Sequence, residues 1–154
     1  MNVKSARLYV SPSRRPLTPE ENETRRISYA IKDPASLTYA QDLETAAREM
    51  ARLFFCPCIL VPVPDRNGNT GANWKLAAAI ARHIAPHAKV TDILKRAKPV
   101  ESSCERHRRR AGALPVDQHH IIRNPKKWLS LQAGTRIFFV DNTTTSGNTL
   151  AACR

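Results

Sequence analysis

The chain has 154 residues, of which 42% are hydrophobic and 25% charged, and these values are typical of one globular domain. The sequence contains no run of about 18 apolar residues, so we expect no membrane-spanning helix. There are 25 lysines and arginines against 13 aspartates and glutamates, which gives a formal charge of +12 and predicts attraction to polyanions.

The first third of the chain predicts two strands and two helices. Residues 6–10 have the pattern of a strand, and residues 18–21 (Thr-Pro-Glu-Glu) are typical of a helix start. We expect that first helix to be short, because residues 26–31 have the pattern of a second strand. From residue 36 to residue 55, apolar residues recur on one helical face and predict an amphipathic helix packed on a sheet.

The middle of the chain predicts a strand, a loop and a helix, then a strand that leads into a basic segment. Residues 58–65 predict a buried strand closed by prolines, and apolar residues at helical spacing from 74 to 84 predict the next helix. Residues 90–94 predict another strand. The segment after it has neither helical nor strand periodicity, and we expect a mobile cationic loop there. The alternatives are a solvated charge run or an unspecific nucleic-acid patch. Its basic residues are Lys95, Arg96, Lys98, Arg106, His107, Arg108, Arg109 and Arg110.

The end of the chain has the pattern of an anion-binding loop. Residues 137–140 predict a buried strand, and Asp141 and Asn142 follow it directly. The next residues offer hydroxyl donors, a glycine that lets the backbone approach a ligand, and the start of a helix with free N–H groups. The candidate phosphate-binding residues are Thr144, Thr145, Ser146, Gly147, Asn148 and Thr149. The alternative is a threonine-rich turn between a core strand and a helix.

The alternation of strands and helices predicts an α/β fold with a mainly parallel sheet flanked by helices on both faces. The loops after Val63, Leu94 and Val140 all leave the carboxyl ends of predicted strands. Ligands of such sheets bind at these ends, so we expect the three loops to converge on one site.

Two motifs resemble the type I phosphoribosyltransferases. In that family a buried strand runs into an acidic pair and then a Thr-Thr-Gly-x-Thr loop, and residues 137–149 match this order, with Asn142 in place of the second acid. Upstream, the Val-Pro-Val-Pro segment of residues 61–64, followed by Asn73 and a Leu-Ala helix, is similar to the branch related to competence protein F. The resemblance covers residues 27–154, and residues 1–26 are then an N-terminal extension.

The resemblance implies a role for each matched position. Asp141 and Asn142 would hold the ribose hydroxyls, and Asp141 would help to organise Mg²⁺ with the substrate. Residues 144–149 would bind the 5-phosphate. The pyrophosphate loop would comprise Pro64, Asp65 and Arg66, and the flexible loop would supply Lys95, Arg96 and Arg109 to the leaving group.

The implied activity is transfer of the 5-phosphoribosyl group from phosphoribosyl pyrophosphate to a nitrogen acceptor of the nucleobase type. An amide at Asn142 can hydrogen-bond a ribose hydroxyl but brings no charge. The alternative is therefore a nonenzymatic protein of the same fold that senses a ligand or binds nucleic acid through its basic surface. Relatives continue through a longer helix to one more strand, so we expect either a fold without its last helix and strand or a sheet covered by a partner or in a homo-oligomer.

The cysteines and histidines do not form a zinc pattern. Cys56 and Cys58 lack a second pair, and we expect buried thiols. The zinc module common in the competence-related branch is not matched. His119 and His120 are expected at polar loop or strand-edge positions. The first 16 residues lack the apolar core of a signal peptide, so we expect a cytoplasmic protein.

Overall fold

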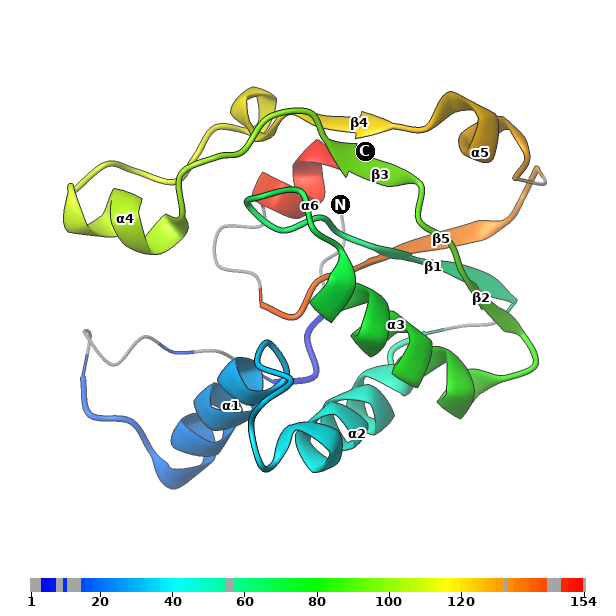
Figure 1. Cartoon of the computed structure of the whole chain (residues 1–154). Coiled ribbons are helices and arrows are strands. Elements are labelled where there is room, and N and C mark those ends of the chain that lie inside the picture. Colours follow the sequence, from blue (N-terminus) through cyan, green and yellow to red (C-terminus); the bar gives the residue numbers. More distant parts are fainter. Residues whose placement is uncertain are drawn as a thin grey trace.

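A three-stranded parallel sheet lies at the centre of the computed structural model, which describes residues 4–7, 10, 15–54, 57–131, 133–143 and 148–153. The strand order is β2 (Ala88–Val90), β1 (Cys58–Pro62), β5 (Arg136–Val140), so the first strand of the sheet along the chain lies in its middle (Figure 1). Residue 58 is in register with residues 88 and 136. The prediction of an α/β fold with a parallel sheet is confirmed.

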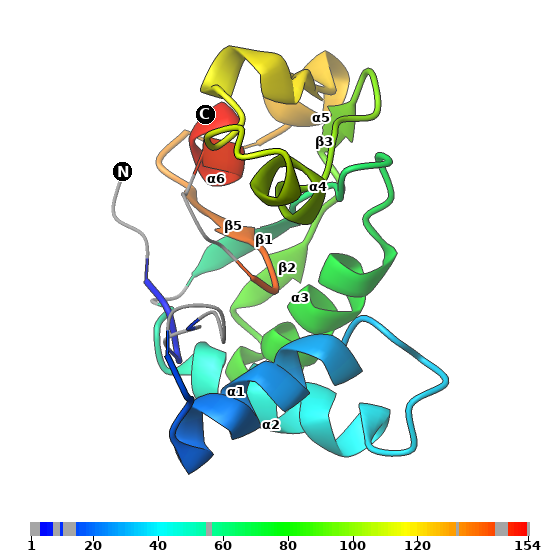
Figure 2. The ribbon, with the colours of Figure 1, turned by 90° about the vertical axis from the view of Figure 1, so that its left-hand side faces the viewer.

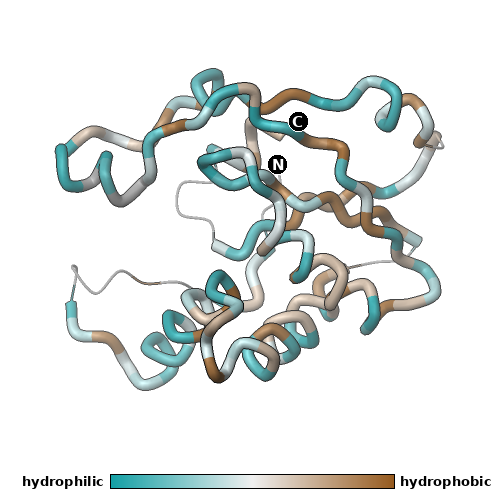
Figure 3. The backbone as a smooth tube through the Cα atoms, viewed as in Figure 1, coloured by the Kyte–Doolittle hydropathy of each residue, from teal (hydrophilic) through white to brown (hydrophobic). Residues whose placement is uncertain are grey.

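Residues of β1 alternate between the two faces of the sheet, because successive strand side chains point in opposite directions. Leu60 belongs to a core cluster that also contains residues of the helices on one face of the sheet. Val61 and Val63 belong to a second cluster on the other face. The hydropathy tube shows apolar residues concentrated along the central strands (Figure 3). The continuous apolar run that predicted this strand therefore reflects burial on both faces.

Three helices cover the first face: α1 (Pro19–Ala30), α2 (Tyr39–Ala51) and α3 (Gly71–Ile84) (Figure 2). The predicted amphipathic helix is confirmed as α2, with narrower bounds, and the predicted helix after the first sheet strand is confirmed as α3. Phe54, just beyond α2, meets Phe138 of β5 edge to face, with ring centroids 5.1 Å apart. These contacts fix the helical layer to the sheet.

The predictions for the residues around α1 need correction. A capping box at Thr18 and Glu21 starts the helix as predicted, but α1 is not short: it has 12 residues, and the strand expected at 26–31 does not form. Ile27 and Ala30 are buried at helical spacing on the face toward the sheet, which favours continuing the helix over starting a strand. Of the strand expected at 6–10, residues 8 and 9 lie outside the described residues, and residues 6 and 7 form a bend.

The second face is covered by a two-stranded antiparallel ribbon, β3 (Leu94–Arg96) with β4 (Ile121–Arg123), and by the short helices η1 (Val116–His119), α5 (Pro125–Leu129) and α6 (Asn148–Ala152). The long strand predicted at 90–94 is wrong. Thr91 N still bonds to Leu60 O at 3.1 Å, but the chain then leaves the parallel sheet and reaches β3 with Ile93 buried beneath it. Helices were expected on both faces of the sheet. The long helices α1, α2 and α3 lie on the first face, and the second face has only short ones among the described residues.

The basic segment contains a helix, α4 (Ser103–Arg108), where the sequence predicted an irregular loop. Ser102 Oγ accepts a hydrogen bond from Glu105 N at 3.1 Å, and Glu105 Oε2 accepts one from Ser102 N at 2.9 Å. This reciprocal cap stabilises the first turn of the helix. The segment has no apolar residues at helical spacing, so its sequence did not predict a helix.

Cys58 and Cys153 are buried as expected. Burial raises the pKa of Cys153 to about 12, with the nearby Asp141 adding to the effect, so this thiol stays protonated at neutral pH. None of the described helices has the length and apolar character needed to cross a membrane.

Candidate functional site

The carboxyl ends of β1 and β5 lie side by side and begin the candidate site. Pro62 is in register with Val140, and one residue later Val63 N donates to Val140 O at 3.0 Å. The loops that start at Pro64 and Asp141 therefore leave the sheet together, as the parallel register requires.

Asn73, in the first turn of α3, connects these two loops. Its Nδ2 donates to Val63 O at 2.8 Å and to Asp141 Oδ1 at 3.2 Å, while its Oδ1 accepts from Asn142 N at 3.0 Å. The side chain is buried, with 6% of the residue exposed, and all three contacts are satisfied inside the protein. This one amide fixes the position of both residues predicted to hold the ribose.

Asp141 has an electrostatic environment suited to receiving a cation. Burial raises the pKa of its carboxyl above the ordinary value, and hydrogen bonds from Asn73 and from the backbone of Thr143 and Asn142, together with the charge of Lys32, act in the opposite direction. A carboxylate held where it is poorly solvated gains more from a nearby positive charge than one in water.

The predicted phosphate loop is described only at its end. Thr144, Thr145, Ser146 and Gly147 lie outside the described residues. Asn148 starts α6, and its Nδ2 donates to Leu114 O at 2.8 Å, while Thr149 Oγ1 lies 3.5 Å from His119 Nδ1. These two residues of the predicted set therefore contact the segment that precedes β4.

The predicted pyrophosphate loop is a tight turn. Asp65 Oδ1 accepts from Asn67 N and Asn69 N, both at 2.8 Å, and Gly68 adopts a φ of +91°, a conformation that favours glycine. Pro64 is fully buried. The carboxylate of Asp65 therefore closes the turn by bonding to its backbone, and Arg66 is the exposed cation of this loop.

Arg66 links the pyrophosphate loop to the basic segment. Its Nη1 lies 2.9 Å from Glu105 Oε2, and its carbonyl oxygen accepts from Val100 N at 2.9 Å. Because half of the Arg66 side chain is exposed, the ion pair itself contributes little to stability. It does bring α4 to the carboxyl end of β1.

Of the three cations expected in the flexible loop, Arg96 is the one placed at the site. Its guanidinium donates to three backbone carbonyls, those of Asp65 at 2.7 Å, Pro64 at 3.3 Å and His119. Burial lowers its pKa, whereas Asp65 and Asp141 favour its charged form. Arg96 lies on β3 and joins the ribbon to the predicted pyrophosphate loop. The prediction that Arg96 lies in a flexible loop is therefore wrong.

The other two expected loop cations lie elsewhere. Lys95 is exposed on β3, where its side chain points away from its buried neighbour Leu94. Arg109 follows α4 and pairs with Glu101 at 3.1 Å while remaining 75% exposed. The structure therefore separates the predicted set into one buried linking residue and two surface residues.

His119 is a site residue that the sequence did not predict. It is 6% exposed at the end of η1, and its Nε2 has no hydrogen-bond partner among the described residues. Desolvation, reinforced by the charge of Arg96, lowers its pKa, so the imidazole is neutral at physiological pH. The sequence signal was weak, since His-His before two isoleucines also fits a strand edge.

Asp141 is the carboxylate that was predicted to bind a metal ion at this site. In the described part of the chain, no three His, Cys, Asp or Glu side chains are grouped to hold a metal ion. Asp141 is the one predicted ligand of that type. The Mg²⁺ that the family resemblance implies at Asp141 stays a prediction.

The site and sheet define a class of α/β protein with polar loops gathered at the carboxyl ends of two adjacent parallel strands. Comparison of the chain with protein-family models, curated proteins and solved structures gave no significant match.

Proposed function

We propose that the chain is a phosphoribosyltransferase that binds phosphoribosyl pyrophosphate with Mg²⁺ and transfers the 5-phosphoribosyl group to a nitrogen acceptor. The observation that carries the proposal is the bridge made by Asn73 between the loop after β1 and the Asp141-Asn142 pair after β5. This bridge supports the proposal because it joins the two segments that separately resemble the family, and the fold we propose is phosphoribosyltransferase-like.

In this proposal Asp141 faces the ribose and the anomeric carbon. Its carboxylate accepts hydrogen bonds from ribose hydroxyls and stabilises the positive charge that develops as the bond to pyrophosphate breaks. Asn142 contributes an amide to the ribose, and the loop that ends at Thr149 holds the 5-phosphate and fixes the anomeric carbon in place. Little proton transfer is required of the protein.

The leaving pyrophosphate would lie against the turn of residues 65–70. Arg66 is the cation that this turn presents outward, and Arg96 holds the turn in place through the carbonyls of Pro64 and Asp65. Mg²⁺, held by Asp141 and by substrate oxygens, would supply neutralisation of the negative charge on the substrate.

Binding and turnover can be tested separately. Calorimetry with phosphoribosyl pyrophosphate and Mg²⁺ measures binding, and pyrophosphate release against a panel of bases measures transfer. We expect both in the wild type, and at least a tenfold loss of binding in Asp141→Asn. Asp117→Asn, an exposed aspartate on η1, is the matched control. Binding without release on any base would overturn the enzyme, and failure to bind would overturn the site.

A second candidate function, binding of nucleic acid without catalysis, is favoured by the charge of +12 and by Asn142. Exposed Lys95 lies opposite exposed Ile122 on the ribbon, and Arg123 stacks on Trp128 with its guanidinium carbon 4.5 Å from the ring centroid. Duplex DNA affinity that falls steeply between low and moderate salt, and that Lys95→Gln weakens but Asp141→Asn does not, would support this function.

A further inference from the structure

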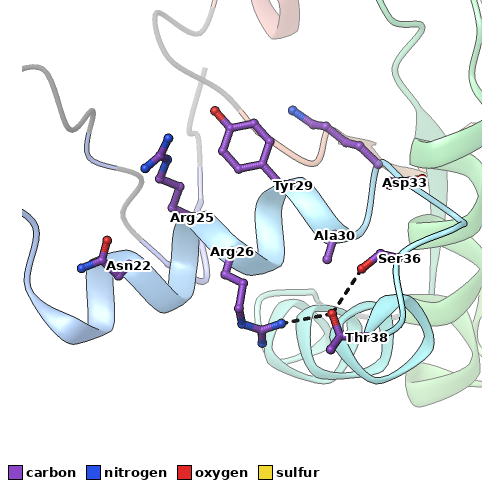
Figure 4. A pocket seen from close by; sticks show the side chains of 9 residues that line it. Asn22, Arg25, Arg26, Tyr29, Ala30, Asp33, Ser36 and Thr38 are labelled. Carbon is purple, nitrogen blue, oxygen red and sulfur yellow. Dashed lines mark hydrogen bonds between the residues drawn. The ribbon is translucent and has the colours of Figure 1, made fainter.

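Some of the positive charges on the surface are neutralised by acidic side chains. A pocket of about 660 Å³ beside α1, lined by residues of that helix and of the segment after it, shows this case (Figure 4). Arg26 of the pocket pairs with Glu23 at 2.8 Å and with the buried Asp42 at 2.6 Å. Its guanidinium also donates to Thr38, at 3.3 Å. The charge of Arg26 is therefore compensated within the protein.

The exposed surface of residues 121–129, which we call the α5 surface, carries positive charge alone. Residues 118–140 include no acid, while Arg123, Lys126 and Lys127 are exposed. Across the described residues, none of these three forms an ion pair. Lys127 Nζ donates to a backbone carbonyl, Asp92 O, at 2.8 Å. This surface therefore attracts anions from outside.

Aliphatic side chains project from the same surface. Leu129 is 81% exposed and Ile122 is 52% exposed. Lys126 and Leu129 are three residues apart on α5, so they lie on the same side of the helix. Trp128 packs against the second core cluster, and the guanidinium carbon of Arg123 lies 4.5 Å from its ring centroid. A projecting leucine thus lies next to a lysine whose charge is unpaired.

The α5 surface lies away from the candidate site. α5 precedes β5 in the chain and adjoins the start of that strand, whereas the site begins at the carboxyl end of the strand (Figure 1). A strand of five residues spans roughly 16 Å. A partner bound at α5 would therefore leave the loops of the site accessible.

The aliphatic side chains distinguish between possible anionic partners. The phosphates of a nucleic acid would pair with the cations but leave Leu129 in water, and the Trp128 ring already contacts Arg123 and the core. A leucine that is 81% exposed projects from the surface and does not line a groove for a peptide. An anionic bilayer would accept both features, because its headgroups pair with cations and its interface takes up aliphatic side chains.

We propose that the α5 surface docks on a membrane surface that contains anionic lipids. Leu129 enters the boundary between headgroups and acyl chains, and Arg123, Lys126 and Lys127 pair with headgroup phosphates. The association is peripheral and reversible, since few side chains take part. This inference goes beyond the proposed function and does not depend on it.

The first test is sedimentation with phosphatidylcholine vesicles, with and without phosphatidylglycerol. We expect binding only to the anionic vesicles, and Lys126→Gln and Lys127→Gln should each weaken it about fivefold, the effect of one lysine near such a surface. Arg48→Gln, an exposed arginine on α2, is the matched control and should change nothing. No binding to anionic vesicles, equal binding to neutral ones, or an equal loss in Arg48→Gln would overturn the proposal.

The second test separates insertion from charge. Leu129→Ser should weaken binding to the anionic vesicles about tenfold. Leu37→Ser, which changes a fully exposed leucine between α1 and α2, is the matched control and should leave binding unchanged. Both side chains are exposed, so both variants should unfold at the wild-type temperature. Equal binding by the two variants would show that α5 does not insert and would refute the proposal.

The third test uses fluorescence. The chain has two tryptophans, so Trp128 is the sole reporter in Trp74→Phe. Brominated acyl chains in anionic vesicles should quench its emission, and the further change Leu129→Ser should reduce the quenching. Binding of duplex DNA that requires Lys126 and Lys127, in a protein that ignores vesicles, would assign the surface to nucleic acid instead. Vesicle binding by a protein that fails to bind phosphoribosyl pyrophosphate would keep this inference and refute the proposed function.

Discussion

The amide of Asn73 donates a hydrogen bond of 3.2 Å to Asp141 Oδ1 across 68 positions of sequence. The same side chain accepts from the backbone of the next residue, Asn142. A helix that follows the first strand of the sheet therefore sets the orientation of the acidic residue that follows the last strand.

Replacing Asn73 by leucine should destabilise the protein and abolish ligand binding. The change keeps the volume but leaves Val63 O and Asn142 N without their partner in a buried position, at a cost of about 1–3 kcal/mol per group. Urea denaturation measures the loss of free energy of unfolding. Asn67→Leu, in the exposed turn, should change it little. Equal midpoints for wild type and Asn73→Leu would contradict the bridging role.

Asp141→Asn should raise stability at neutral pH while it removes ligand binding. The folded-state pKa of Asp141 is raised, chiefly by burial, so ionisation costs folding free energy above that pKa, and the cost disappears as pH falls below the unfolded value of about 3.9. The variant lacks this cost. Thermal unfolding from pH 3 to pH 8 should therefore show Tm curves that coincide in acid and diverge toward neutral pH.

The reverse pattern, in which Asp141→Asn unfolds at lower temperature at pH 8 than the wild type does, would show that the carboxylate is stabilised in the fold. Asp117→Asn serves again as the control, because that side chain is exposed. The comparison separates a residue kept for binding from one kept for stability.

Arg96→Lys should loosen the turn of residues 65–70. Lysine keeps the charge but cannot direct donors to the carbonyls of Pro64, Asp65 and His119 in one plane, and we expect a loss of about 1.5–3 kcal/mol. Hydrogen exchange should speed up at the amides of the turn. Lys95→Met, one position earlier and facing away, should leave the exchange unchanged. If both variants behave alike, Arg96 does not hold the turn.

The pair of Arg26 and Asp42 should make stability fall in acid. Hydrogen bonding to Arg26 lowers the pKa of Asp42, so its contribution is present above the unfolded value of about 3.9 and is lost as pH falls through the folded value. Asp42→Asn should cost about 1.5–3 kcal/mol at pH 7 and reduce the acid dependence.

Glu44→Gln removes a surface carboxylate from α2 and is the control for the Asp42 experiment, since exposed ion pairs contribute little. Urea titrations at pH 7 and pH 3 give the comparison. A stability difference between Asp42→Asn and wild type that is as large at pH 3 as at pH 7 would contradict the ionic origin.

The sequence predicted the sheet strands well where burial on both faces produced continuous apolar runs. β1 and β5 are examples, and α2 and α3 followed from helical periodicity. The strand expected at 26–31 was wrong because Ile27, Ala30 and Ile31 fit either period in a short window, and the capping box at Thr18 decided for the helix.

The candidate site was less accessible to prediction. Asp141 and Asn142 follow a clear strand and could be placed, whereas the burial of His119 and the three carbonyl contacts of Arg96 depend on a ribbon that the sequence did not reveal. β3 and β4 have only three residues each, too few for alternation to be recognised. Tertiary contacts, and not local pattern, set these positions.

The residues that line the pocket beside α1 come from the first third of the chain, whereas Asp141 and Asn142 follow the last strand of the sheet. Substitutions on the exposed turns of α1 should therefore change the lining of this pocket without disturbing the hydrogen bonds of Asn73 to Val63 and Asp141. The exposed turns of α1 can therefore vary in sequence independently of the loops at the carboxyl ends of the parallel strands.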